Sequence, residues 1–137
     1  MKRFKLVEHT ADVGVEARGH TLEDLFASTA EGMFSIMTDL DRVKETESVR
    51  LLVRGEGPEE LLIAFLSELL YRHEIEGIFF KRVEIARMDN RSLEAEAVGE
   101  RVNLKRHALG AQIKAATYHQ LSITHNEEWE SRVIFDI

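Results

Sequence analysis

The chain has 137 residues, of which 44% are hydrophobic and 31% are charged, and its formal net charge is -7. This composition is typical of a globular domain and excludes intrinsic disorder, collagen-like repeats and a long coiled coil. The absence of cysteine excludes disulfides, thiol catalysis and zinc–thiolate sites, and the acidic balance disfavours general nucleic-acid binding. We therefore expect a single cytoplasmic domain over residues 1–137, with neither a signal peptide nor a membrane span.

Alternating apolar and polar residues predict most of the secondary structure as β-strands. A period of two turns successive side chains to opposite faces of a half-buried sheet. The segments with this pattern are Phe4–Leu6, Val13–Ala17, Val49–Val53, Val83–Ile85, Leu93–Ala97, Ile113–Ile123 and Trp129–Phe135. The polar stretch Gly99–Gly110 precedes the longest of them, which is one long strand or a bent pair of strands.

Two further segments predict helices. Apolar residues recur at helical spacing up to Met37, and Thr21 is a suitable N-cap for that helix. Pro58 suits the first position of a second helix, which is apolar on most sides from Leu61 to Leu70 and which we expect to be the more deeply buried. The side chains expected in the core are Phe26, Met33, Leu62, Phe65 and Leu69.

The order of these elements indicates an α+β fold. Alternating strands joined by short turns favour a mainly antiparallel sheet, with the two principal helices packed on one face and a wetter opposite face. A single proline and eight scattered glycines leave no linker that would divide the chain. The sequence thus predicts one α+β domain.

Two segments place acidic groups near the expected end of a strand. In His9–Gly14, a turn directs the imidazole of His9 and the carboxylate of Asp12 toward one rim of the sheet, although a polar hairpin turn explains the segment as well. At the chain end, Asp136 lies one residue from the α-carboxylate of Ile137. Two anions this close repel unless a cation lies between them, and oxygen ligands suit Ca²⁺ or Mg²⁺. The alternative is that Ile137 packs and Asp136 is solvated.

A local reversal of charge stands out in this acidic chain. Between positions 100 and 119 the only acidic residue is Glu100, among the bases and histidines Arg101, Lys105, Arg106, His107, Lys114 and His119. Such a stretch suits a phosphate or an acidic partner, and a solvated loop is the commoner explanation. The sequence has no glycine-rich phosphate loop and no nucleophile or zinc-protease motif, so a standard enzyme is not supported.

Four segments together resemble the archease family, in their order and spacing over essentially the whole chain. They are His9–Gly14, Leu61–Tyr71, Lys114–His119 and Val133–Ile137. The resemblance implies a small α+β protein that is not itself an enzyme and has no catalytic residues of its own. It implies an activator of RtcB, the GTP-dependent tRNA-splicing ligase, which promotes guanylylation of a ligase histidine and multiple turnover. The partners it implies are this ligase and, through the ligase complex, tRNA.

The resemblance also implies a divalent cation, expected to be Ca²⁺. The positions that match its ligands are Asp12, Asp136 and the α-carboxylate of Ile137. Four residues in similar segments are weaker candidates for partner binding or an accessory role: His9, Lys105, His107 and Lys114. Two other functions stay open, namely a stand-alone metal-dependent phosphohydrolase and a chaperone or modulator of RNA-modifying enzymes.

Overall fold

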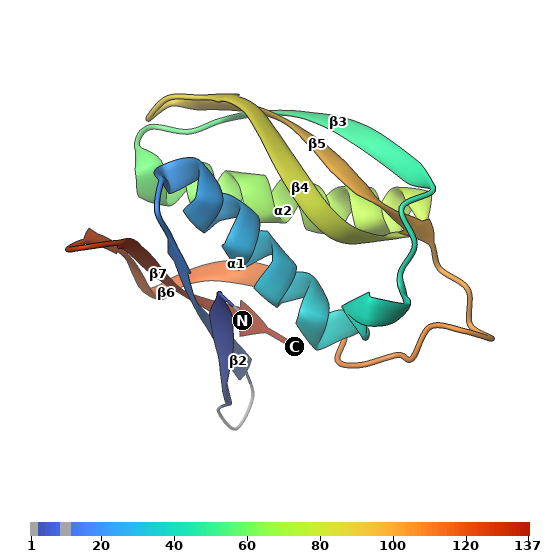
Figure 1. Cartoon of the computed structure of the whole chain (residues 1–137). Helices are drawn as coiled ribbons and strands as arrows, with labels where there is room; N and C mark the ends of the chain where they lie inside the picture. Colours follow the sequence, from blue (N-terminus) through green and yellow to red (C-terminus); the bar gives the residue numbers. More distant parts are fainter. Residues whose placement is uncertain (1–2, 9–11) are drawn as a thin grey trace.

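The computed structural model describes residues 3–8 and 12–137. The strands are β1 (Phe4–Glu8), β2 (Asp12–Gly19), β3 (Glu47–Arg54), β4 (Ile78–Met88), β5 (Ser92–Arg101), β6 (Ala115–His125) and β7 (Trp129–Asp136). The helices are α1 (Leu22–Met37), the short 3₁₀ helix η1 (Leu40–Arg42) and α2 (Pro58–Glu76). A long connection without regular structure, residues 102–114, joins β5 to β6 and is called the crossing loop below (orange in Figure 1).

The two long helices lie between two antiparallel sheets (Figure 1). Sheet A has the strand order β1-β2-β7-β6, and sheet B has the order β3-β5-β4. The α+β class with antiparallel strands is therefore confirmed. The strands divide into two sheets, and the helices cover one face of each, because an alternating pattern reports which face of a strand is buried but not which strands are neighbours.

The apolar faces of both sheets meet the helices in one core. All five side chains expected there are fully buried, and the rings of Phe26 and Phe65 lie 5.7 Å apart across the two helices. Helix α1 approaches sheet A closely at Gly32, where an added Cβ would lie 2.6 Å from Cγ1 of Val15. A larger side chain at that position would push the helix away from the sheet.

The expectation that α2 is the more deeply buried helix is wrong. Ten of the 16 residues of α1 are buried, but only six of the 19 residues of α2, and the last of those six is Leu69. The second half of α2 stays in contact with the core through Leu70 and His73, whose ring stacks on that of Phe79, while Tyr71 and Ile75 are exposed. Gly77 ends the helix in the left-handed conformation, with φ 65°. A run of apolar residues alone does not show which side of a helix its neighbours leave open to solvent.

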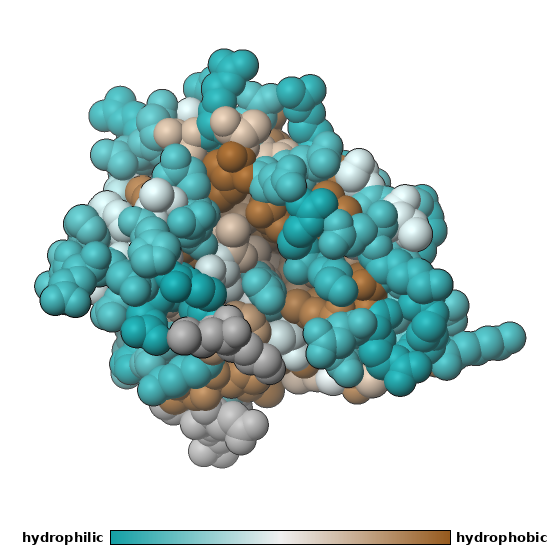
Figure 2. Space-filling model, viewed as in Figure 1, coloured by the Kyte–Doolittle hydropathy of each residue, from teal (hydrophilic) through white to brown (hydrophobic). Residues whose placement is uncertain are grey.

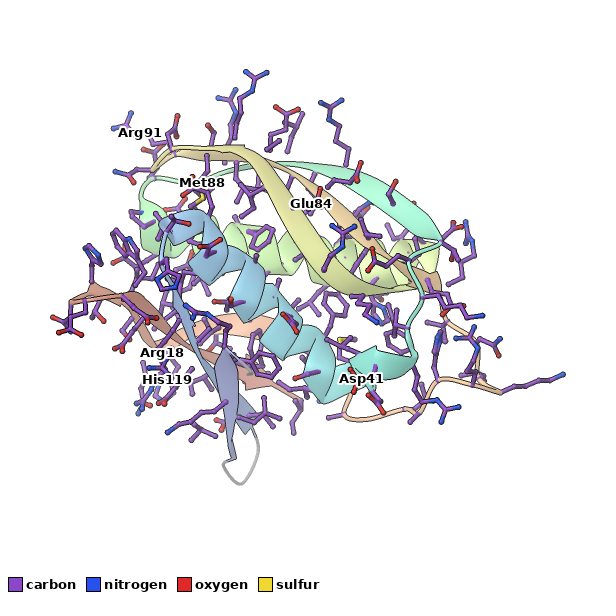
Figure 3. The ribbon with its side chains drawn as sticks, viewed as in Figure 1. Arg18, Asp41, Glu84, Met88, Arg91 and His119 are labelled. Atoms are coloured by element: carbon purple, nitrogen blue, oxygen red, sulfur yellow. The ribbon has the colours of Figure 1, made fainter. Side chains whose placement is uncertain are left out.

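The outer faces of the sheets are polar. Glu84 and Arg91 project from sheet B and its β4–β5 turn, while Arg18 and His119 project from sheet A on the other side of the helix layer (Figure 3). Hydrophilic side chains cover most of the face in Figure 2. No helix in the described part of the chain is long and apolar enough to cross a membrane.

Strand β6 is interrupted by a bulge. Thr117 pairs with Ile134 and Ser122 pairs with Arg132. The four residues of β6 between these pairs, 118–121, therefore correspond to a single residue of β7. Gln120, inside the bulge, has the left-handed φ of 53°. The bulge matches the bent pair of strands that the sequence predicts for this segment. Ile113, which was expected in the strand, lies in the crossing loop instead.

Candidate metal centre

The structure brings Asp12 and Asp136 together at the end of sheet A. The strands β2 and β7 are antiparallel neighbours, and Asp12 is directly opposite Asp136 in their register. The carbonyl of Asp136 accepts a hydrogen bond from the backbone N–H of Lys114 on the other side of β7, at 2.8 Å. Asp12 and Asp136 therefore form a non-hydrogen-bonded pair, the kind in which opposite side chains approach most closely, with Cα atoms about 4.5 Å apart.

Both carboxylates lie on the face of sheet A that points away from the helices. Their neighbours Val13 and Phe135 are buried against the helices, and side chains alternate along a strand. Two like charges directly opposite each other destabilise a sheet. Neither carboxylate forms an ion pair or a side-chain hydrogen bond with another described residue. The pair therefore concentrates negative charge without a cation from the described part of the chain.

One oxygen of the pair is buried and unsatisfied. Among the described side chains, Oδ1 of Asp12 is the only buried nitrogen or oxygen without a hydrogen-bond partner. A buried carboxylate oxygen without a partner is costly, and a bound cation would remove that cost. Two carboxylates with such an oxygen fit a hard cation of the calcium or magnesium class.

Such a cation needs more ligands than these two carboxylates supply. No group of three histidine, cysteine, aspartate or glutamate side chains that could hold a metal ion occurs in the part of the chain that the structure describes. Ile137 follows Asp136 directly, and His9 lies outside the described residues. The two carboxylates therefore need further oxygens, from a terminal carboxylate, backbone carbonyls or water, to complete a site of six to eight oxygens.

The two candidate lysines lie in different places. Lys114 ends the crossing loop, next to the residue of β6 that pairs with Asp136. Lys105 is exposed near the start of that loop. No ion pair or side-chain hydrogen bond occupies either ammonium group within the described residues. Of the two lysines, only Lys114 is therefore beside the strand that carries Asp136.

His107 is buried and holds the crossing loop in place. Its Nδ1 accepts the backbone N–H of Asn103 at 2.9 Å, so its Nε2 is the donor to Oε1 of Glu100, also at 2.9 Å. Glu100 also accepts hydrogen bonds from the guanidinium of Arg106 and from the backbone N–H of Lys44. His107 thus positions the loop, and its ring is not exposed to a partner in this structure.

This network was not anticipated as a unit, although its signal is visible in the sequence. Glu100 is the one acid in a basic stretch, and the structure uses it to neutralise Arg106 and to bind His107. Arg101 pairs with Glu47 in the same way. Within this stretch the protein itself neutralises Arg101 and Arg106, and among the described residues only Lys105 and Lys114 keep a cation without an ion pair.

The pKa of Glu100 predicts a pH-dependent contribution to stability. The hydrogen bonds from Arg106, followed by the one from the Lys44 N–H, hold the pKa of Glu100 well below its ordinary value, although burial acts in the opposite direction. A carboxyl whose pKa is lower in the folded state stabilises the fold above its unfolded pKa, about 4.3, and loses that contribution as the pH falls further. We expect Glu100→Gln to lower the free energy of unfolding at pH 7, with a smaller difference from the wild type toward pH 3, as measured by urea denaturation.

The matched control for this change is Glu127→Gln. Glu127 is exposed and has no ion pair in the described structure, so its loss should leave the free energy of unfolding unchanged at both pH values. A difference between Glu100→Gln and wild type that stays constant from pH 7 to pH 3 would show that the charge of Glu100 is not what stabilises the loop.

Similarity to known proteins decides the family. The sequence model of the archease protein family matches residues 4–137. The chain belongs to the archease family. The archease of Thermococcus gammatolerans is 37% identical over 142 aligned positions, which cover 100% of both chains. That of Danio rerio is 32% identical, over 99% of this chain and 86% of its own.

Solved structures show the same architecture. A solution structure of protein 1598 from Methanobacterium thermoautotrophicum matches 100% of both chains, with a TM-score of 0.83 at 34% identity. A crystal structure from Thermotoga maritima, described as an archease and possible chaperone, has a TM-score of 0.65 at 25% identity, over 97% of this chain and 96% of its own. The two-sheet fold is therefore that of the archease family.

Proposed function

We propose that this protein activates an RNA ligase of the RtcB type. It acts as an accessory protein that promotes guanylylation of the ligase and so permits multiple turnover in tRNA splicing. Membership of the archease family supports the proposal. The observation that carries it is the pair of opposed carboxylates, Asp12 and Asp136, whose charge no described residue balances.

The residues that would hold a divalent cation are Asp12, Asp136 and the terminal carboxylate of Ile137. When bound there, a cation such as Ca²⁺ supplies positive charge that stabilises the anionic groups of a nucleotidyl transfer. The chain itself supplies a rigid support, because each aspartate is fixed in a strand of sheet A. The carboxylates also face away from the helices, toward the surface that a partner can reach.

A ligation assay tests the proposal. The cognate ligase is mixed with excess RNA bearing 2′,3′-cyclic phosphate and 5′-hydroxyl ends, with GTP and a divalent cation, with and without this protein. We expect about one product per ligase molecule without the protein and many with it. Equal yields would contradict the activator role, and GTP hydrolysis by the isolated protein would favour a metal-dependent phosphohydrolase instead.

A chaperone role is the second candidate. It is favoured by the description of the Thermotoga maritima relative as a possible chaperone. Suppression of the heat-induced aggregation of unrelated proteins, at stoichiometric amounts, would support that role. An activator specific for the ligase should leave such aggregation unchanged.

The role of Ile137 in the cation site has its own test. Adding one glycine after Ile137 moves the terminal carboxylate by about 3.3–3.6 Å and leaves the net charge and the core unchanged. Because calcium ligands lie at about 2.3–2.6 Å, the affinity for Ca²⁺ and the activation of the ligase should both fall, while the melting temperature without the cation stays the same. Isothermal titration calorimetry measures the affinity. An unchanged affinity would exclude the terminal carboxylate of Ile137 as a ligand and would leave Asp12 and Asp136 as the two carboxylate ligands.

A further inference from the structure

The second half of α2 carries apolar side chains that the fold does not use. Tyr71 is 56% exposed and Ile75 is 60% exposed. They are four residues apart, so they lie one above the other on the same face of the helix. Most of the charged side chains in this part of α2 form ion pairs with one another, since Arg72 pairs with both Glu68 and Glu76. The exposed apolar face is therefore distinct from the ion-paired face beside it.

A groove of about 670 Å³ runs between this part of α2 and the crossing loop, and we call it the α2 groove. Leu70, Tyr71 and Glu74 line it from the helix, and Val102, Ile113 and Lys114 line it from the loop. Its walls mix apolar and polar side chains, since Ser67, His73 and Gln112 also line it, together with the one cation, Lys114, and the one anion, Glu74. A groove that combines apolar side chains with a few well-placed polar groups is typical of a binding site.

The loop side of the groove is fixed by hydrogen bonds along its length. The Val102 N–H donates to the carbonyl of Gly77 at 2.8 Å, and the Gly110 N–H donates to the end of α1 at 2.8 Å. The Lys114 N–H donates to Asp136 at 2.8 Å, and buried His107 holds the middle of the loop. A wall that is already ordered costs little conformational entropy when a ligand binds.

The polar groups of the groove are available to a ligand. Neither the ammonium of Lys114 nor the carboxylate of Glu74 forms an ion pair with a described residue, and the Tyr71 hydroxyl has no hydrogen bond there. A polyanion fits poorly, because it needs clustered cations and the groove offers Lys114 together with the anion Glu74. An apolar side chain next to a single carboxylate that faces Lys114 complements the groove in both shape and charge.

We propose that the α2 groove is the docking site for a partner protein, which inserts an apolar side chain between Tyr71 and the crossing loop and places a carboxylate against Lys114. This inference rests on the proposed function, which identifies the partner as the RNA ligase. The groove ends at Lys114, which is bonded to the residue that carries one of the two carboxylates. A ligase held in the groove is therefore held beside the end of sheet A, whose opposite face carries Asp12 and Asp136.

Direct binding of the purified ligase to fluorescently labelled full-length protein tests the docking site, and multiple-turnover ligation is measured in parallel. Tyr71→Arg should raise the dissociation constant by roughly tenfold or more, as for aromatic anchors of other interfaces. Ile75 does not line the groove but lies one turn from Tyr71 on the same exposed face, so Ile75→Arg should also raise the dissociation constant. Lys114→Gln should weaken binding and reduce its dependence on salt. At saturating concentrations, Tyr71→Arg and Ile75→Arg should restore the maximal ligation rate, because they leave the carboxylates intact.

The control variants carry the same changes elsewhere. Leu52→Arg alters a residue that is 76% exposed on the outer face of sheet B, and Lys44→Gln removes an exposed lysine outside the groove. Both should leave the dissociation constant unchanged to within about twofold. Circular dichroism checks that every variant keeps the fold, and the affinity for Ca²⁺ checks that the Tyr71, Ile75 and control variants keep the carboxylate site.

The outcomes separate this inference from the proposed function. Binding that survives both Tyr71→Arg and Ile75→Arg to within about twofold overturns the docking site, even if the wild type activates ligation. Binding that these variants weaken, without any activation by the wild type, supports the docking site and overturns the proposed function. No binding of the wild type to the ligase overturns both.

Discussion

Replacing Asp136 by asparagine should lower the affinity for Ca²⁺ by at least about tenfold, and Asp12→Asn should act in the same direction. Each change removes one formal charge from a pair of directly opposed carboxylates that no described residue neutralises. Calorimetric titration with Ca²⁺ measures the effect. Activation of the ligase should fall with the affinity, since the proposed function needs the bound cation.

The same variants should have the opposite effect on the protein without a cation. Like charges directly opposite each other destabilise a sheet, so removing one of them should raise the melting temperature in the presence of a chelator. Added Ca²⁺ should then stabilise the wild type, because a ligand that binds only the folded state raises its stability, and it should stabilise the variants much less. This crossover distinguishes a cation site from a merely structural role for Asp12 and Asp136.

Asp89→Asn is the matched control. Asp89 lies in the turn between β4 and β5, on the far side of the helix layer from sheet A, near the labelled Met88 and Arg91 in Figure 3. It accepts the backbone N–H groups of Arg91 and Ser92, both at 2.8 Å, and asparagine retains an oxygen for these bonds. Equal loss of Ca²⁺ affinity in Asp89→Asn and Asp136→Asn would mean that total charge, and not a site, governs binding.

The largest effect on stability is expected for Phe65→Ala. The ring of Phe65 has no exposed surface and packs 5.7 Å from the ring of Phe26, in the layer between the two sheets. Removing a buried aromatic ring loses its transfer free energy and leaves a cavity, at a cost of about 3–5 kcal/mol. Urea denaturation at pH 7 measures this loss.

A change at Tyr71 of the same helix serves for comparison. Tyr71→Ala also removes an aromatic ring, but 56% of this residue is exposed, so the free energy of unfolding should change by less than about 1 kcal/mol. Similar losses for the two variants would show that the buried and exposed faces of α2 are wrongly assigned.

Local patterns were sufficient for the elements and for the core. The sequence predicts the N-cap at Thr21 correctly because its hydroxyl accepts the N–H of Asp24 within the same turn, at 3.0 Å. Pro58 begins α2, as predicted. The burial of Phe26 and Phe65 followed from helical spacing, which depends only on neighbours along the chain. These interactions are local, so they leave a direct trace in the sequence.

The candidate site was only partly predictable. The acidic end of the chain and the turn before Asp12 suggested that two carboxylates share a rim, and the register of β2 and β7 provides the contact between them. Nothing in the sequence showed that Oδ1 of Asp12 is buried without a partner. That property depends on the side chains from the rest of the fold that surround this atom, and so on packing and not on spacing.

The sequence by itself determined that two helices and a set of alternating strands form an α+β fold. Tertiary structure alone decided that the strands form two sheets around the helices, that one side of α2 stays open to solvent near its end, and that Glu100 binds His107 of the crossing loop. The physical reason is the range of the interactions. Periodicity and capping act within a few residues, whereas strand partners and buried polar pairs bring together segments that the chain keeps apart, and many pairings are compatible with the same local pattern.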